Sequence, residues 1–135
     1  MKAGFHAVAQ RGGIAPQKST IAPNVGTPAP LPTEAKARKA VPLFSGCMAY
    51  FPRALAAVAE CSRIGNEQHN PGAPLHWDRA KSSDEADALA RHLLEHGTID
   101  TDGIRHSAKV AWRALALLEK ELEAASDQDM SRMLK

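Results

Sequence analysis

The sequence predicts an all-α fold: a small helical bundle of three to four helices, with a long polar loop between the first two helices. Three segments place apolar residues at the three- and four-residue spacing of amphipathic helices, and no segment alternates as a strand does. An apolar fraction of 44% with 24% charged residues is typical of a soluble globular protein. At 135 residues the chain has room for one domain.

The first 40 residues differ in composition from the rest. They contain five of the nine prolines and six Lys or Arg against the single acid Glu34, and they show no apolar periodicity. Such a segment buries too little apolar surface to offset its ordering entropy. We therefore predict a disordered basic tail over residues 1–40, a helical domain over residues 41–126, and a short polar C-terminal tail over residues 127–135.

Charge and hydropathy exclude two classes of partner. Residues 41–135 carry eleven basic against fourteen acidic side chains, so we expect no direct nucleic-acid binding. No apolar run approaches the roughly 20 residues of a membrane helix, so we expect no membrane partner.

The first helix is predicted over residues 52–65. Pro52 is a favoured first-turn residue and Gly65 is a natural stop. One face of this helix carries Leu55, Val58, Ala59 and Ser62.

Two further helices follow the polar loop. The second is expected to begin at a capping box made by Ser82 and Glu85, and to end at Gly97. The third is expected to begin near Asp102 and to run to Ser126. The predicted buried stripes are Ala86, Leu89, Ala90, Leu93 and Leu94 on the second helix, and Ala108, Ala111, Leu115, Leu118 and Leu122 on the third. Because this core is thin and rich in alanine, we expect a homodimer or homotetramer that shares a core.

The loop of residues 65–79 is longer than a turn requires, and long connections in compact domains are often functional. Asn side chains there could read hydrogen-bonding edges, and Trp77 could either stack on a base or close the loop over the core. Basic side chains nearby could face a polyanion, with Lys109 and Arg113 joining them from the third helix. The candidate substrate-binding residues are Asn66, His69, Asn70, Trp77, Arg79, Lys81 and Arg91.

Five of the six histidines fall between residues 69 and 106, close to several carboxylates. Histidine and carboxylate on neighbouring helices of a bundle are typical of a metal site, whereas single histidines are more often solvated or capping residues. The substring HLLEH, residues 92–96, matches the H-x-x-E-H pattern of zinc peptidases. That match is only five residues long, and the chain has little room for a distal third ligand or a substrate cleft. A zinc peptidase is therefore disfavoured.

The order of these motifs resembles the phage-associated dATP/dGTP diphosphohydrolase domain family, distantly grouped with all-α nucleotide pyrophosphohydrolases. The resemblance rests on "FPRALAAVAECSRIGNEQ", a following Trp, "RHL", "DGIRH" and an Ala- and Leu-rich helix, over about residues 41–123. The positions that match family motifs are Gly65, Trp77, Arg91, His92, Gly103 and His106. Residues 65–69 read Gly-Asn-Glu-Gln-His where relatives commonly have Gly-Ala-x-Lys-Tyr, and the paired acidic motifs of the distant relatives are absent.

This resemblance implies hydrolysis of a purine deoxynucleoside triphosphate to monophosphate and pyrophosphate, with Mg²⁺ or Mn²⁺ as cofactor. It also implies a cytoplasmic protein, encoded by a phage or prophage in a bacterial host. The candidate metal ligands are Glu67, Asp100, Asp102 and His106, and the candidate catalytic residues are His92, His106 and Asp102, with His92 as base or supporting partner. The alternative is a non-catalytic nucleotide-binding or assembly module on the same helical scaffold.

Overall fold

The fold was analysed in a computed structural model, which describes residues 30–81 and 83–133, with side chains as far as Asp127. The elements are α1 (Ala35–Lys39), the π-helical turn η1 (Phe44–Met48), α2 (Pro52–His69), the 3-10 turn η2 (Arg79–Lys81), α3 (Glu85–Leu94) and α4 (His106–Met133). Within the described ranges the extended pairing amounts to one antiparallel bridge, between Ile99 and Arg105. The predicted all-α class is confirmed.

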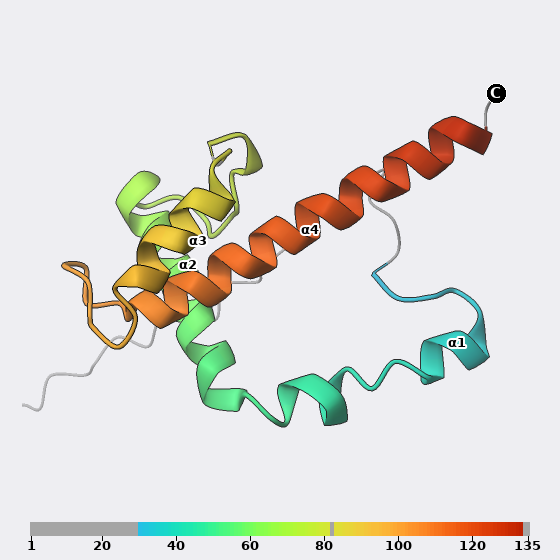
Figure 1. The fold of residues 1–135 in the computed structure, drawn as a ribbon, viewed down its shortest axis with the longest axis horizontal. Coiled ribbons are helices and arrows are strands. Elements are labelled where there is room, and N and C mark those ends of the chain that lie inside the picture. The colour runs from blue at the N-terminus through green and yellow to red at the C-terminus, as the bar shows by residue number, and fades with distance from the viewer. Residues whose placement is uncertain (1–29, 82, 134–135) are drawn as a thin grey trace, which may run out of the picture.

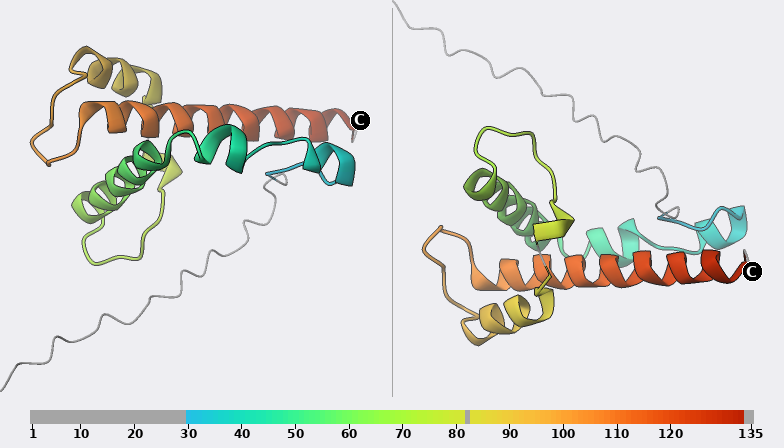
Figure 2. Two further views of the ribbon diagram at one scale, coloured as in Figure 1. Left: turned by 90° about the horizontal axis from the view of Figure 1, so that it is seen from below. Right: turned by 90° about the horizontal axis from the view of Figure 1, so that it is seen from above.

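The long helix α4 is the axis of the molecule, and α2 and α3 lie on opposite sides of its N-terminal half (Figures 1 and 2). The buried apolar side chains at these contacts are the alanines Ala88, Ala108 and Ala116, and Ile104 is buried in the loop that precedes α4. Alanine at a helix crossing lets two backbones approach closely, but it removes little apolar area from water. Among the described residues no large side chain is fully buried, so the core of a single chain is thin, as predicted.

Helix α2 does not end at Gly65, which corrects the predicted boundary. It continues for one more turn to His69, and a glycine inside a helix costs only about 1 kcal/mol relative to alanine. Helix α2 ends instead just before Pro71, because a residue that precedes proline disfavours helical backbone. As a result Asn66 and His69, which were assigned to the loop, lie on the last turn of α2.

Helix α4 begins at His106 rather than near Asp102. The side chain of Asp102 accepts a hydrogen bond from the Ile104 N–H at 3.0 Å, and Gly103 has a φ of +81°. A side chain that bonds the backbone two residues ahead favours a turn over a helix. Residues 98–106 therefore form a tight loop, closed by the hydrogen bond from the His106 N–H to the Thr98 carbonyl at 3.2 Å.

Two of the predicted segments and one predicted helix cap lie partly or wholly outside the described residues or differ from the structure. Residues 1–29 of the predicted tail lie outside the described part of the chain, while α1 forms one helical turn within its last residues. Helix α4 runs through residue 126 to Met133, into the segment predicted as a C-terminal tail. Ser82, the predicted cap of the second helix, is also outside the described residues.

The face of α3 that packs on α4 differs from the predicted stripe. Ala88 and Glu85 are buried, whereas Leu93 and Leu94 are 51% and 86% exposed, and Ala86 and Ala90 are exposed as well. Polar contacts set this orientation: the buried Glu85 carboxylate pairs with Lys120 of α4 at 2.6 Å, and His92 meets His106. The apolar periodicity identified the helix but not the side that it buries.

The segment before α2 leaves the bundle and runs toward the C-terminal end of α4 (Figure 2). Its large apolar side chains are exposed, namely Val41, Leu43, Phe44, Met48, Tyr50 and Phe51. Within the described ranges no single helix has the length and apolar content of a membrane span. One bent pair, residues 35–48 with 52–69 meeting at 89°, reaches them by length and composition only.

Candidate functional site

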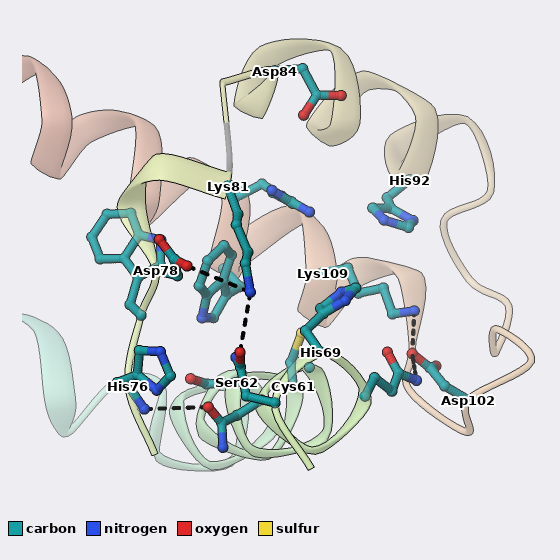
Figure 3. Close-up of a pocket in the computed structure, with 17 residues that line it drawn as sticks. Cys61, Ser62, His69, His76, Asp78, Lys81, Asp84, His92, Asp102 and Lys109 are labelled. Atoms are coloured by element: carbon teal, nitrogen blue, oxygen red, sulfur yellow. Dashed lines mark hydrogen bonds and ion pairs between the residues drawn. The ribbon is translucent and has the colours of Figure 1, made fainter. Parts of the chain in front are cut away.

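A cavity of about 540 Å³ opens between α2, the loop of residues 70–81 and the first turns of α4 (Figure 3). Many of the residues singled out from the sequence line it: Asn66, His69, Asn70, Trp77, Lys81, His92 and Asp102. Cys61, Ser62, Gly65 and Gln68 of α2 also line it, together with Trp112 of α4. Because α2 continues to His69, its cavity-lining residues form two adjacent rows on one helix. One row is Cys61, Gly65 and Gln68, and the other is Ser62, Asn66 and His69.

Asn66 holds the loop in place instead of facing a ligand with a free amide. Its side-chain amide donates to the Ala73 carbonyl at 3.2 Å, and its carbonyl oxygen accepts from the His76 N–H at 3.4 Å. Asn66 is buried at the end of α2, so both halves of its amide are used within the protein. Asn66 thus fixes residues 73–76 beside the cavity, and its role in binding a substrate stays a prediction.

Trp77 lies between cationic and aromatic neighbours. The Arg79 guanidinium lies 4.1 Å from the centre of the Trp77 ring, and the Trp112 ring meets it edge-on at 5.8 Å. Arg79 is itself held by Glu123 of α4 at 3.0 Å. Arg79 covers one face of the indole, so the position of Trp77 fits the second of its two predicted roles, closing the loop over the core.

Of the basic residues predicted near the substrate, Lys81 reaches the middle of the cavity (Figure 3). Its ammonium lies 3.2 Å from the Asn70 side-chain oxygen and 3.6 Å from Asp78. Lys109 and Arg113 of α4 also line the cavity. Arg79 and Arg91 do not line it: Arg79 contacts Glu123, and Arg91 pairs with Asp84 at 2.7 Å.

His92 of α3 and His106 of α4 meet at one end of this cavity. Their Nδ1 atoms are 3.0 Å apart, and His106, only 6% exposed, also has its Nδ1 3.2 Å from a Glu95 carboxylate oxygen. Asp100 completes the group, because His92, Asp100 and His106 can each offer a ligand atom within 4.8 Å of the others. The short loop of residues 98–106 brings the carboxylate back to the two imidazoles.

Lys109 joins this group to the second carboxylate. Its ammonium lies 2.6 Å from Asp100 and 2.6 Å from Asp102, and Asp102 is also held by the Gln68 side chain at 3.3 Å. Lys109 lies one helical turn after His106, so both side chains project from the first turns of α4. The sequence placed Lys109 among phosphate-facing cations, but gave no signal that it bridges two aspartates.

These contacts fix the charge of the titratable groups. The Lys109 ammonium, with the Thr101 N–H, holds the pKa of Asp100 well below its usual range. Burial alone would raise the pKa of Asp102, but Lys109 and the Ile104 N–H lower it overall. Burial, and then the positive charge of Lys109, lowers the pKa of His92. His92 is therefore neutral at pH 7, which is the state that a metal-ligating imidazole needs.

The donor set fits a divalent cation. The Nδ1 atoms of His92 and His106 lie 3.0 Å apart, and each ring could offer a nitrogen to one ion if that nitrogen carries no proton. Asp100 adds the oxygen that Mg²⁺ and Mn²⁺ favour, and two imidazoles favour Mn²⁺ over Mg²⁺. Of the ligands predicted from sequence, Asp100 and His106 belong to this group, and Asp102 reaches it through Lys109.

Two other residues singled out from the sequence, Glu67 and His96, lie outside the group. Glu67 is exposed on the last turn of α2 and is not part of the cluster. His96 lies beyond the end of α3, where its Nδ1 contacts the Leu93 carbonyl at 2.8 Å. His92 and His96 are therefore not a pair on one helical face, and the zinc-peptidase pattern has no geometric support. Burial raises the pKa of the Cys61 thiol, so this pocket-lining cysteine is protonated at neutral pH.

Comparison with known proteins gives one result for the family. No curated protein and no solved structure gives a significant match to the chain. The family model described as "dATP/dGTP diphosphohydrolase, N-terminal" matches residues 33–130, which include α1 and nearly all of α4. The matched range contains the whole cavity and the group His92, Asp100 and His106. With most of its length matched, the chain belongs to the dATP/dGTP diphosphohydrolase N-terminal domain family.

Proposed function

We propose that this protein hydrolyses purine deoxynucleoside triphosphates of the dATP/dGTP type to monophosphate and pyrophosphate, with Mn²⁺ or Mg²⁺ as cofactor. The observation that carries this proposal is that His92 belongs to both parts of the site. It lines the cavity, and it also belongs to the possible metal-binding group with Asp100 and His106. Family membership supports the nucleotide class.

The cavity provides cations for a triphosphate and an aromatic wall for a base. Lys81, Lys109 and Arg113 line the cavity and could contact the charged oxygens of a polyphosphate. Because Asp78, Asp84 and Asp102 line it as well, a bound divalent cation would supply the excess of positive charge. Trp77 and Trp112 both line the cavity. Arg79 lies 4.1 Å from the centre of the Trp77 ring and Arg113 lies 5.4 Å from that of Trp112, so we assign base stacking to Trp112, which is the less closely covered ring. His69 and Asn70 lie on the rim formed by the end of α2.

Hydrolysis requires water to attack the α-phosphorus, with cleavage of the bond to the bridging oxygen and departure of pyrophosphate. A bound divalent cation would neutralise phosphate charge and make water a stronger nucleophile. The protein's part is to hold that cation with His92, Asp100 and His106, and to place cationic side chains beside the charge that develops on the leaving group. A neutral His92 suits a ligand role as well as its predicted role as base, and its place in the group with Asp100 and His106 favours the ligand role.

We also propose that the protein forms a homodimer or a homotetramer. The exposed leucines of α4 and the exposed apolar residues before α2 are too many for a stable single chain with so thin a core. We also propose that the reaction takes place in the bacterial cytoplasm, the location that the resemblance to phage proteins implies.

A panel of the four deoxynucleoside triphosphates, scored for pyrophosphate release with Mn²⁺, with Mg²⁺ and with EDTA, tests the proposal. We expect release from dATP or dGTP that depends on the metal, and little from the pyrimidine nucleotides. Binding of the purine nucleotides without any pyrophosphate release would support the alternative, a nucleotide-binding module that has lost the chemistry.

A further inference from the structure

The ammonium of Lys109 occupies a position that connects the proposed metal site with the proposed phosphate site. It contacts Asp100, which belongs to the group with His92 and His106, and Asp102, which lines the cavity. Lys109 itself lines the cavity, and its contact with Asp102 can be followed in Figure 3. All three side chains are at most about one quarter exposed, so their charges are only partly screened by water.

A divalent cation at His92, Asp100 and His106 would compete with Lys109. Asp100 is the only carboxylate in that group, and its Oδ2 atom is already 2.6 Å from the Lys109 ammonium. Two positive charges that share one carboxylate repel each other over a short distance. A cation bound there would therefore weaken the contact between Lys109 and Asp100.

The surroundings allow this exchange without loss of the ligand geometry. The other oxygen of Asp100 accepts a hydrogen bond from the Thr101 N–H at 2.6 Å, so its orientation does not depend on Lys109. Asp102 is held separately by the Gln68 side chain and by the Ile104 N–H. When the ammonium leaves Asp100, both carboxylates stay anchored and Lys109 remains at the cavity wall.

We propose that Lys109 is a positioning residue that couples the two sites: it neutralises Asp100 until the metal binds, and is then released toward the triphosphate. This inference rests on the proposed function and adds the order of events at that site, in which the metal prepares the phosphate site. A lysine that stayed permanently paired with Asp100 could not connect the metal site with the phosphate site in this way.

The test is calorimetric titration of Mn²⁺ into the wild-type protein and into the Lys109→Met and Lys81→Met variants. Lys109→Met removes the competing charge, so we expect it to bind Mn²⁺ at least about tenfold more tightly. Lys81→Met removes a cavity charge that does not contact Asp100, and should leave Mn²⁺ affinity within about twofold of wild type. Unchanged or weaker Mn²⁺ binding by Lys109→Met would overturn the proposal.

A second titration uses a non-hydrolysable dATP analogue with and without Mn²⁺. Complex formation between the ion and the analogue is the same for every variant, so it cancels in the comparison. We expect Mn²⁺ to increase analogue affinity at least about fivefold less in Lys109→Met than in wild type, and equally in Lys81→Met and wild type. An equal gain in all three proteins would contradict the coupling.

The outcomes separate this inference from the proposed function. If wild type binds Mn²⁺ and His106→Ala does not, the metal site stands, and only the Lys109 variants decide the coupling. If wild type binds no Mn²⁺, the proposed site and the inference both fail. Lys109→Gln replaces Lys109→Met if that variant does not fold, as judged by circular dichroism. Loss of folding in both would show that Lys109 is structural and would overturn the proposal.

Discussion

The contact between His92 and His106 sets the chemistry at the scale of single residues. With Nδ1 atoms 3.0 Å apart, one ring must donate and the other accept, so two protonated imidazoles are not compatible with this contact. The lowered pKa of His92 acts in the same direction. For both Nδ1 atoms to bind one cation, the donating ring would have to carry its proton on Nε2 instead, because a ligating nitrogen offers a lone pair.

Trp77 can be tested as a structural residue. Trp77→Ala removes the ring that packs against Arg79 and Trp112, and we expect a loss of about 2–4 kcal/mol in the free energy of unfolding, measured by urea denaturation. Trp77→Phe should lose less than half as much, because the indole N–H forms no hydrogen bond within the described residues. Weakened nucleotide binding by Trp77→Ala at full stability would show instead that Trp77 stacks on the base.

The sequence predicted the identity of many site residues better than their roles. His92, Asp100 and His106 converge as the paired histidines and nearby acids suggested. Asn66 and Arg79 make contacts that the sequence did not predict, because polar side chains that can bind a ligand can equally bind the backbone or a neighbouring helix. Such a choice depends on which partner lies within hydrogen-bond distance, and the spacing along the chain does not encode that.

At the scale of elements, the last turn of α2 connects the helix to the loop that borders the cavity. The sequence located all three main helices, since their apolar periodicity is strong, but it misplaced the end of α2, the end of α3 and both ends of α4. Gly65 was interpreted as a stop although Pro71 ends the helix, and Asp102 was interpreted as a helix start although its side chain forms a turn. Glycine and aspartate are compatible with more than one local structure, and packing decides between them.

Asn66 gives a test at this scale. Asn66→Ala breaks two hydrogen bonds between α2 and the loop and leaves two loop backbone groups without that partner. We expect a loss of about 1–3 kcal/mol in the free energy of unfolding by urea denaturation. Asn70→Ala removes only an exposed contact with Lys81 and should change stability by less than about 0.5 kcal/mol. Equal effects of the two substitutions would contradict the anchoring role of Asn66.

At the scale of the whole molecule, the apolar side chains are distributed as in a chain that shares its core with another copy. Leu118 and Leu122 of α4 are 51% and 56% exposed, while the buried apolar residues in the described part of the chain are three alanines and Ile104. The periodicity of α4 predicted that its leucines would be buried, and within one chain they are not. The same pattern is satisfied if a second copy covers this face of α4.

The proposed oligomer can be tested by introducing charged residues on the face of α4 that carries Leu118 and Leu122. We expect light scattering with size-exclusion chromatography to give a mass of two or four times 14.5 kDa for the wild type. The Leu118→Glu/Leu122→Glu variant should shift toward the monomer mass, because it places two carboxylates in the shared apolar surface. Leu94→Glu, at an 86% exposed position on α3, is the matched control and should keep the wild-type mass. A monomeric wild type would exclude the shared core.

The most direct measurement of the central claim is pyrophosphate release from dATP and dGTP with Mn²⁺, compared among wild type, His106→Ala and His96→Ala. His106 belongs to the group with His92 and Asp100, whereas His96 lies outside it beyond the end of α3. We predict metal-dependent release by wild type and His96→Ala, and at least about a hundredfold loss in His106→Ala with unchanged helical content by circular dichroism. Full activity in His106→Ala, or no release by the wild type with either metal, would contradict the account.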